Sequence, residues 1–243
     1  MSFYKTTKSP VVSIIIPCYN EYDNLMNLLE GIISLTENFD VEFILVENGS
    51  TDDSRKFLQE YVGETLPRIH VVYVDKNRGY GYGIKMGIQK ASGAYTGWIH
   101  ADLQVPISEL EKFLDQIDTR QIDVFYKARR KGRSLFDQFF TTGQAIFNSI
   151  LFHEHLKDAA SVPMLVPTSL LKNNFMYLTD DFSIDMYVYV KAVKSGLKPV
   201  WIPVHLQPRK AGVSSWNRGI TSKFKQSKVI FKNSFKVKEL LER

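Results

Sequence analysis

The alternation of short apolar runs with helix-like segments over the first half of the chain constrains the fold more than any other feature. The apolar runs have the length of strands, and the segments between them repeat apolar residues at helical spacing, as at Leu25, Leu28 and Leu29. Strands that alternate with helices predict an α/β fold with a mostly parallel sheet flanked by helices. The expected strands cover residues 11–16, 41–46, 69–74, 95–99 and 122–126, and the expected helices cover residues 25–33, 52–61, 81–91 and 107–117.

The second half of the chain is less regular, but it has neither an internal repeat nor a low-complexity linker, so we expect one compact unit. Its segments include a Phe-rich stretch at 134–152, expected strands at 164–166 and 199–205, an expected helix at 181–195 and a basic helix at 218–241.

Composition narrows the class of protein. Of 243 residues, 44% are hydrophobic and 23% are charged, which is globular composition and excludes disorder and fibrous repeats. The single cysteine, Cys18, excludes a disulfide framework and a Cys-based zinc site, and it fits a reducing compartment. No apolar run approaches eighteen residues and the N-terminus lacks an apolar signal core, so we expect a cytoplasmic protein without a spanning helix.

The charge is distributed unevenly. The net charge is +5, yet residues 205–243 carry ten Lys and Arg against two Glu, a local +8, which leaves about −3 for the rest of the chain. A basic tail on a mildly acidic body predicts an anionic partner, which is a nucleotide phosphate, a lipid headgroup or a nucleic acid. No nucleic-acid recognition motif accompanies the tail.

Polar or glycine-rich segments follow four successive expected strands. Parallel sheets bind ligands at the carboxyl ends of their strands, so these segments are candidates for a site. The alternative is a set of ordinary turns, with Ser50 or Asp52 as a helix cap and Gly79 and Gly81 as turn residues. The segments are residues 17–21 (PCYNE), 47–52 (ENGSTD), 75–83 (DKNRGYGYG) and 100–104 (HADLQ).

Together these segments resemble the motifs of glycosyltransferase family 2, and most of all its dolichol-phosphate mannose synthase and polyprenyl-phosphate glycosyltransferase branch. The resemblance spans residues 11–215 and implies a GT-A fold, with residues 1–215 as the catalytic domain and 216–243 as a basic amphipathic helix. The four segments are similar to P-x-Y-N-E, D-D-G-S-x-D, N-x-G-x-G and D-A-D-L-Q, while residues 158–161, 182–185 and 209–214 are similar to D-x-x-S-G-F-R, F-D-V-E and R-x-x-G-x-S-K.

The resemblance implies an inverting transferase that takes its sugar from a nucleotide-diphosphate sugar. The implied catalytic residues are Asp102, Asp185 and Arg209. The implied acceptor-side residues are Asp158, Ser161, Asp181 and Ser214. The residues implied to bind the donor are Pro17, Tyr19, Asn20, Glu21, Glu47, Gly49, Ser50, Asn77, Gly79, Gly81, Lys85, Ala101, Arg129, Arg130 and Lys210.

A divalent cation, Mn²⁺ or Mg²⁺, would stabilise the departing diphosphate as a Lewis acid. The expected ligands are His100, Asp102 and Gln104, whose two-residue spacing would put them on one side of an extended segment. The family usually has Asp at position 100, and imidazole suits Mn²⁺ better than Mg²⁺. His100 therefore predicts a Mn²⁺ preference or a weaker metal dependence. The alternative is a hydrogen bond from His100 to the diphosphate.

Positive side chains should face the phosphates across the cleft, because a guanidinium offers phosphate a fixed fork of donors. By family position the candidates are Arg129, Arg130 and Arg209, with solvated surface charge as the alternative. Ser215 replaces the family's Lys after Gly-x-Ser, so Lys210 is the expected substitute.

Two positions bear on the acceptor. The Asp that serves many family members as general base corresponds to Ser183, and a phosphate monoester needs no base because its second pKa is about 6. This favours a polyprenyl phosphate acceptor, although Asp180, Asp181 or Asp185 could replace the base. Residues 162–164 (VPM) stand where the branch often has Gly-Phe-Arg, which weakens the same inference.

The last segment indicates a membrane surface. One helical face carries apolar residues among many lysines, as in helices that lie on anionic membranes. The apolar residues are Trp216, Ile220, Phe224, Phe231 and Phe235. We therefore expect peripheral attachment at the inner face of a membrane, with packing on the sheet as the alternative. The Phe-rich stretch could add to this surface.

The sequence thus predicts transfer of a sugar to a polyprenyl phosphate. One alternative is transfer to a hydroxyl of a surface polysaccharide or lipopolysaccharide. A second is a non-catalytic nucleotide-sugar-binding protein, because positions 48, 100 and 183 depart from the family pattern.

Overall fold

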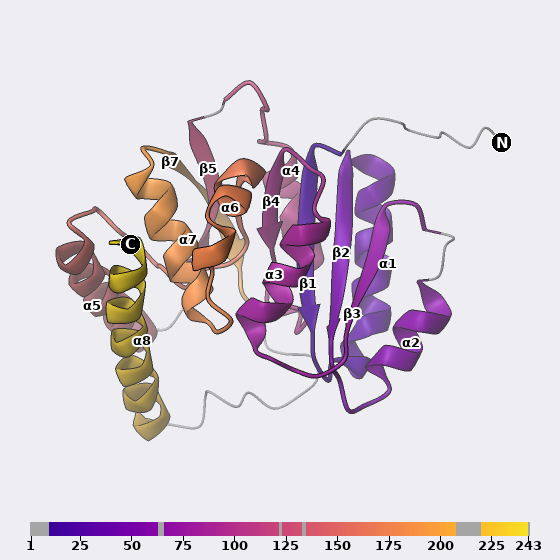
Figure 1. The fold of residues 1–243 in the computed structure, drawn as a ribbon, viewed down its shortest axis with the longest axis horizontal. Helices are drawn as coiled ribbons and strands as arrows, with labels where there is room; N and C mark the ends of the chain where they lie inside the picture. Colours follow the sequence, from indigo (N-terminus) through magenta and orange to yellow (C-terminus); the bar gives the residue numbers. More distant parts are fainter. Residues whose placement is uncertain (1–9, 63–65, 122, 133–134, 208–219, 243) are drawn as a thin grey trace.

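The computed structural model describes residues 10–62, 66–121, 123–132, 135–207 and 220–242, of which 135–137 and 220–227 are described by their backbone alone. The described strands form one seven-stranded sheet in the order β3-β2-β1-β4-β6-β5-β7 (Figure 1). The strands are β1 (Val12–Cys18), β2 (Val41–Asn48), β3 (Ile69–Val74), β4 (Tyr95–Trp98), β5 (Val124–Lys131), β6 (Met164–Pro167) and β7 (Lys198–His205).

The sheet is parallel except at β6, which runs antiparallel to both β4 and β5. Strands β1 and β2 are buried on both faces and are apolar almost throughout, as expected for central strands of a parallel sheet. The predicted mostly parallel α/β fold is therefore confirmed.

Helices cover both faces of the sheet and divide the core into two clusters. One cluster lies under α1 and α2, and the other lies under α3, α6 and α7. The helices are α1 (Tyr22–Asn38), α2 (Ser54–Tyr61), α3 (Tyr80–Lys90), α4 (Glu111–Leu114), α5 (Leu135–Phe152), α6 (Thr168–Asn173), α7 (Ser183–Lys194) and α8 (Ile220–Leu241), with 3-10 turns η1 (Ile107–Leu110) and η2 (Phe175–Tyr177).

Helices α5 and α8 lie side by side beyond α7, away from the β1–β3 end of the sheet (Figure 1). Helix α8 also packs on α7, and Val237 of α8 belongs to the second core cluster. One face of α8 is therefore core. Phe231 and Phe235, on another face, are 37% and 53% exposed.

The helix predicted over residues 107–117 is much shorter, because η1 and α4 end at Leu114. The chain then turns back towards β5, and the Tyr126 hydroxyl accepts a hydrogen bond from the Asp118 N–H at 3.2 Å. Among the described residues, none of the helices combines the length and apolar character needed to cross a membrane.

Candidate active site

The loops after β1 and β2 hold each other in place. The Asn20 N–H donates to the Ser50 Oγ at 3.1 Å, and the Thr51 N–H donates back to the Asn20 Oδ1 at 2.8 Å. Asn20 itself adopts a left-handed backbone conformation with φ 55°. The Glu21 N–H donates to the Ser54 Oγ at 3.1 Å. These bonds leave Tyr19 42% exposed at the rim of the sheet.

Glu47 is fully buried, and both of its carboxylate oxygens have partners. One oxygen accepts from the Ser50 N–H at 2.6 Å, and the other pairs with the Arg55 Nε at 2.7 Å. Gly49 has φ 72°, and a side chain there would collide with the backbone of Lys76 and Asn77. Glu47 and Gly49 therefore shape the loop that follows β2 and join it to the loop that follows β3.

The loop after β3 is closed by similar short-range bonds. The Asn77 Oδ1 accepts from the Gly79 N–H at 2.8 Å, and the Asn48 Nδ2 donates to the Gly79 carbonyl at 3.0 Å. A side chain at Gly81 would collide with the Thr179 carbonyl, so α3 can begin this close to the chain before α7 only with glycine there. Lys85 points to Asp180 and pairs with it at 2.9 Å.

His100, Asp102 and Gln104 line one cavity of about 230 Å³, together with Arg130. We call it the donor-side cavity, because the sequence analysis predicts the donor diphosphate beside these residues. The segment is not extended, so the geometry expected from two-residue spacing was wrong. Leu103 has φ 55°, and the Asp102 Oδ1 accepts from the Gln104 N–H at 3.1 Å, which turns the chain. The three side chains nevertheless reach one space, and Asp102 is only 6% exposed.

A stack of three rings connects this cavity to the start of α7. The Tyr80 ring lies 5.2 Å from His100 and 4.5 Å from Phe182, nearly parallel to both. Behind the stack, the Asp185 Oδ1 accepts from the Trp98 Nε1 at 2.8 Å. Burial raises the pKa of Asp185, against the opposing influence of His100 and of the hydrogen bond from Trp98. Burial and the nearby charges of Asp185 and Asp102 raise the pKa of Tyr80.

The two arginines at the end of β5 differ in their surroundings. Arg130 lies at the donor-side cavity and forms a two-pronged pair with Asp158, in which its Nε is 2.9 Å from the Asp158 Oδ2. Arg129 is exposed and lines a different cavity. Ser161 is fully buried, and its Oγ donates to the Asp158 carbonyl at 2.9 Å.

Lys127 is a buried cation that the sequence analysis did not single out. It is fully buried in β5, and its Nζ donates to the carbonyls of Ser161 at 2.8 Å and Ala159 at 3.2 Å. Burial lowers the pKa of Lys127 to about 8. A lysine inside the apolar run 124–128 was the available signal. Its charge lies behind the loop at 158–161, which the sequence analysis assigns to the acceptor.

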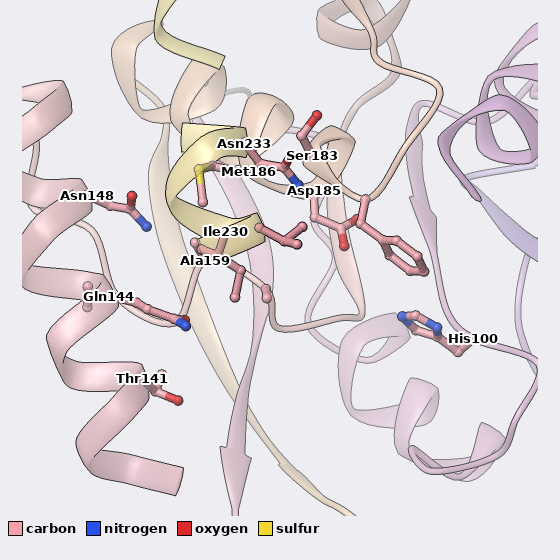
Figure 2. Close-up of a pocket in the computed structure, with 14 residues that line it drawn as sticks. His100, Thr141, Gln144, Asn148, Ala159, Ser183, Asp185, Met186, Ile230 and Asn233 are labelled. Atoms are coloured by element: carbon pink, nitrogen blue, oxygen red, sulfur yellow. The ribbon is translucent and has the colours of Figure 1, made fainter. Parts of the chain in front are cut away.

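A second cavity, of about 280 Å³, opens beside the first and shares His100 and Ala160 with it. Figure 2 shows its walls, with Asn148 and Gln144 on α5, Ile230 on α8 and Asp185 near the start of α7. Apolar atoms make up most of this lining. The donor-side cavity and this apolar cavity therefore meet at His100.

Asp181, another residue predicted to lie on the acceptor side, is held by Ser183 and Lys236. Asp181 accepts from the Ser183 N–H at 2.9 Å and pairs with Lys236 of α8 at 2.7 Å. Burial alone would raise the pKa of Asp181, but the hydrogen bonds from Lys236 and Ser183 lower it. The Ser183 Oγ also donates to Thr179 at 3.0 Å. Arg209, Lys210, Ser214, Ser215 and Trp216 lie outside the described residues.

The donor set at the 230 Å³ cavity fits a hard cation that takes most of its ligands from a substrate. Within the described ranges, no cluster of three His, Cys, Asp or Glu side chains could hold a metal. The cavity offers one carboxylate, one imidazole and one amide. Cations such as Mg²⁺ are commonly held by one or two carboxylates together with substrate phosphates.

Comparison with known protein families shows to which family the chain belongs. The sequence matches the family described as Glycosyl transferase family 2 over residues 13–170. The chain belongs to glycosyltransferase family 2. The match includes the loops after β1, β2 and β3, the segment 100–104 and the end of β5, so the recognition made from the motifs is confirmed.

Named relatives of this family 2 chain include polyprenyl-phosphate transferases. It is 32% identical over 120 residues to the undecaprenyl-phosphate 4-deoxy-4-formamido-L-arabinose transferase of Edwardsiella ictaluri, a match that covers 49% of this chain and 36% of that protein. It is 32% identical over 167 residues to the Klebsiella pneumoniae transferase of the same name, covering 61% and 50%. The chain thus spans half or less of the length of these relatives.

Solved structures confirm the fold. The glucosyl-3-phosphoglycerate synthase of Mycobacterium tuberculosis, in complex with Mn²⁺, UDP and glucosyl-3-phosphoglycerate, superposes with a TM-score of 0.69 at 15% identity. The superposition covers 94% of this chain and 80% of that one. This family 2 chain therefore has the GT-A fold of that enzyme over nearly its whole length.

Proposed function

We propose that this family 2 chain transfers a sugar from a nucleotide-diphosphate sugar to a polyprenyl phosphate. The observation that carries the proposal is the junction at His100 of a polar cavity holding Asp102 and Arg130 with an apolar cavity. A charged donor fits the first cavity, and a lipid-borne acceptor fits the second. The undecaprenyl-phosphate transferases among its relatives support the same acceptor class.

In this proposal a divalent cation held at Asp102, with His100 and Gln104 beside it, neutralises the charge that develops on the leaving diphosphate. The Mn²⁺ in the M. tuberculosis enzyme supports Mn²⁺ as the first cation to try. An oxygen of the acceptor phosphate attacks the anomeric carbon from the face opposite the diphosphate. The bond from this carbon to the diphosphate oxygen breaks, and its electron pair leaves with the nucleoside diphosphate.

The acceptor side suits a nucleophile that is already anionic and needs no general base. Position 183 is a serine bonded to Asp181, and Asp181 is itself paired with Lys236. A phosphate monoester is largely dianionic at neutral pH, so none of these groups has to remove a proton. The buried ammonium of Lys127 and the guanidinium of Arg130 provide positive charge near the loop at 158–161.

A second candidate function is transfer to a hydroxyl of a surface glycan. The raised pKa of Asp185, a carboxyl that lines the apolar cavity, favours it because a general base works best with a pKa near the working pH. A Bacillus subtilis relative, 32% identical over 110 residues, is named as a candidate teichuronic acid biosynthesis glycosyltransferase.

We further propose that residues 216–243 and α5 attach the enzyme to the inner face of an anionic membrane. On the described part of these helices, Phe139, Phe231 and Phe235 are exposed, and Lys228, Lys232 and Lys236 lie along α8. Exposed aromatic residues beside lysines suit a headgroup region.

The test begins with a thermal-shift panel of nucleotide sugars, with and without Mn²⁺, because a bound donor raises the melting temperature. The selected donor, radiolabelled in its sugar, is then incubated with undecaprenyl phosphate in detergent. We expect label in an organic-extractable product that mild acid releases. Label found only in a glycan would favour the second candidate. Donor binding without any turnover, hydrolysis included, would indicate a non-catalytic binder.

A further inference from the structure

A third cavity, of about 480 Å³, lies at the end of β5 and carries a concentration of positive charge. Its walls include Arg129 and Lys131 of β5, Lys157, Thr142 of α5 and Trp201 of β7. Arg129 and Lys131 are two residues apart on one strand, so their side chains leave β5 on the same side. We call this space the basic chamber.

Among the side chains that the structure describes, none balances the charge of Arg129, Lys131 and Lys157 in the basic chamber. Arg130 is paired with Asp158, the acidic residue of the lining. Arg129, Lys131 and Lys157 form no ion pair with any residue in the described ranges. Three like charges around one space repel one another, and a bound anion relieves this repulsion.

The basic chamber is separate from the space expected to hold the donor diphosphate. His100, Asp102 and Gln104 line the donor-side cavity and not the chamber, and the two spaces share Arg130. The chamber also shares Thr141 with the apolar cavity. An anion in the chamber is therefore additional to the donor.

The chemistry of the lining favours phosphate. A guanidinium fork, two ammonium groups and the Thr142 hydroxyl are donors that match phosphate oxygens. On α5, Phe139 follows Gln138 of the chamber wall and is 75% exposed, and Ile146 and Ile150 extend the apolar stripe. A phosphate in the chamber could thus belong to a lipid whose apolar part lies along α5, or to a soluble ester.

We propose that the basic chamber binds a phosphate group distinct from the donor diphosphate, through Arg129, Lys131 and Lys157. The proposal does not require a particular donor or acceptor. It therefore goes beyond the function proposed above and can be tested without turnover.

The experiment uses the full chain labelled with 5-fluorotryptophan and followed by ¹⁹F NMR. The three tryptophans are Trp98, Trp201 and Trp216, and Trp201→Phe assigns the chamber resonance. Titration with inorganic phosphate should move the Trp201 resonance saturably. The double variant Lys131→Gln/Lys157→Gln should weaken this binding by about tenfold or more, because two charge-assisted contacts are lost. Lys56→Gln/Lys90→Gln, which removes the same charge elsewhere, should bind like the wild type.

Vesicles then distinguish the two sources of phosphate. If sedimentation with phosphatidylglycerol–phosphatidylcholine vesicles falls in the chamber variant but not in the control variant, the ligand is a lipid headgroup. If the variant loses only free phosphate, the ligand is a soluble phosphate ester. If neither phosphate nor vesicles move the Trp201 resonance, or if both double variants bind alike, the proposal is overturned. Donor binding, followed at the Trp98 resonance, tests the proposed function independently.

Discussion

The two halves of the proposed active site are built in different ways. The donor half, formed by the loops after β1, β2 and β3, is stitched by short hydrogen bonds such as those between Asn20 and residues 50–51. The acceptor half is enclosed by α5, α7 and α8. Lys127 does not line this cavity, and its ammonium instead donates to the carbonyls of Ala159 and Ser161. The comparison teaches that family motifs specify the loops of the donor half, whereas tertiary packing creates the acceptor half.

The largest effect is expected in the donor-side cavity. Asp102→Asn removes the one carboxylate of the donor-side cavity, so kcat for sugar transfer should fall by about 10³-fold, in line with losses of electrostatic stabilisation of a leaving group. The melting temperature should change little, since the amide keeps the shape of the side chain. Initial rates with the identified donor and Mn²⁺ measure the effect. Near-normal activity in this variant would remove Asp102 from the mechanism.

A buried acid, Glu42, lies at the opposite end of the strands that carry the donor-half loops. Glu42 accepts from the Ser13 Oγ at 2.6 Å and from the Ser92 N–H at 2.8 Å. Burial opposes its charge, but hydrogen bonds from His70, Ser13 and Ser92 lower its pKa from 4.5 to about 2. A lowered folded-state pKa contributes stability that is full above the unfolded value and is lost as the pH falls from 4.5 towards 2.

We therefore expect the wild type to lose about 3 kcal/mol of unfolding free energy over that window through Glu42. Glu42→Gln should be less stable at neutral pH and should show a flatter acid dependence. Urea unfolding at a series of pH values measures both quantities. Parallel acid profiles for wild type and variant would contradict the assignment.

The acceptor half can be broken at Lys127. Lys127→Met keeps the length of the side chain but leaves the carbonyls of Ala159 and Ser161 without their donor, at a cost of about 1–3 kcal/mol for each buried group. The loop at 158–161 should shift, and kcat/KM for the acceptor should fall by about thirtyfold, with donor affinity retained. In the wild type, loss of the Lys127 proton near pH 8 should lower kcat/KM for the acceptor in the same way. Equal falls in donor affinity and in kcat/KM for the acceptor would show that the two halves do not act independently.

The smallest effect should come from removing one of the hydrogen bonds that join the loops of the donor half. Asn20→Ala removes the acceptor of the Thr51 N–H, so the loops after β1 and β2 loosen, and the donor dissociation constant should rise by about fivefold. The acceptor KM should stay unchanged. Isothermal titration with the donor gives the first value and steady-state rates give the second. Thr36→Ala, which removes a hydrogen bond on α1 away from the rim, is the matched control.

Much of the donor half could be predicted from the sequence because its signals are local. The apolar runs at 11–16 and 41–46 indicate buried strands. Of the two glycines expected in turns, Gly79 has a positive φ of 112°, whereas Gly81 lies inside α3. The turn at Leu103 could not be predicted, because it depends on a hydrogen bond from the Gln104 N–H to the Asp102 side chain. Nor could the antiparallel insertion of β6, since four residues do not specify their direction.

The acceptor half was less predictable because its contacts join residues that lie far apart in the sequence. The burial of Lys127 depends on Tyr189, whose ring lies 4.6 Å from the ammonium, and on carbonyls more than thirty residues away in the sequence. The spacing of apolar residues shows that α8 has two faces, but it does not show that Val237 packs in the core while Phe235 is exposed. Such contacts exist only once the helices are assembled.

The imidazole at position 100 borders both the donor-side cavity and the apolar cavity, and it also ends the stack that runs through Tyr80 to Phe182. Kinetic constants measured for any variant at that position will therefore combine effects on the donor with effects on the acceptor. Only double-mutant cycles, pairing a change at 100 with one at Gln104 and then with one at Met186, can apportion the loss between them.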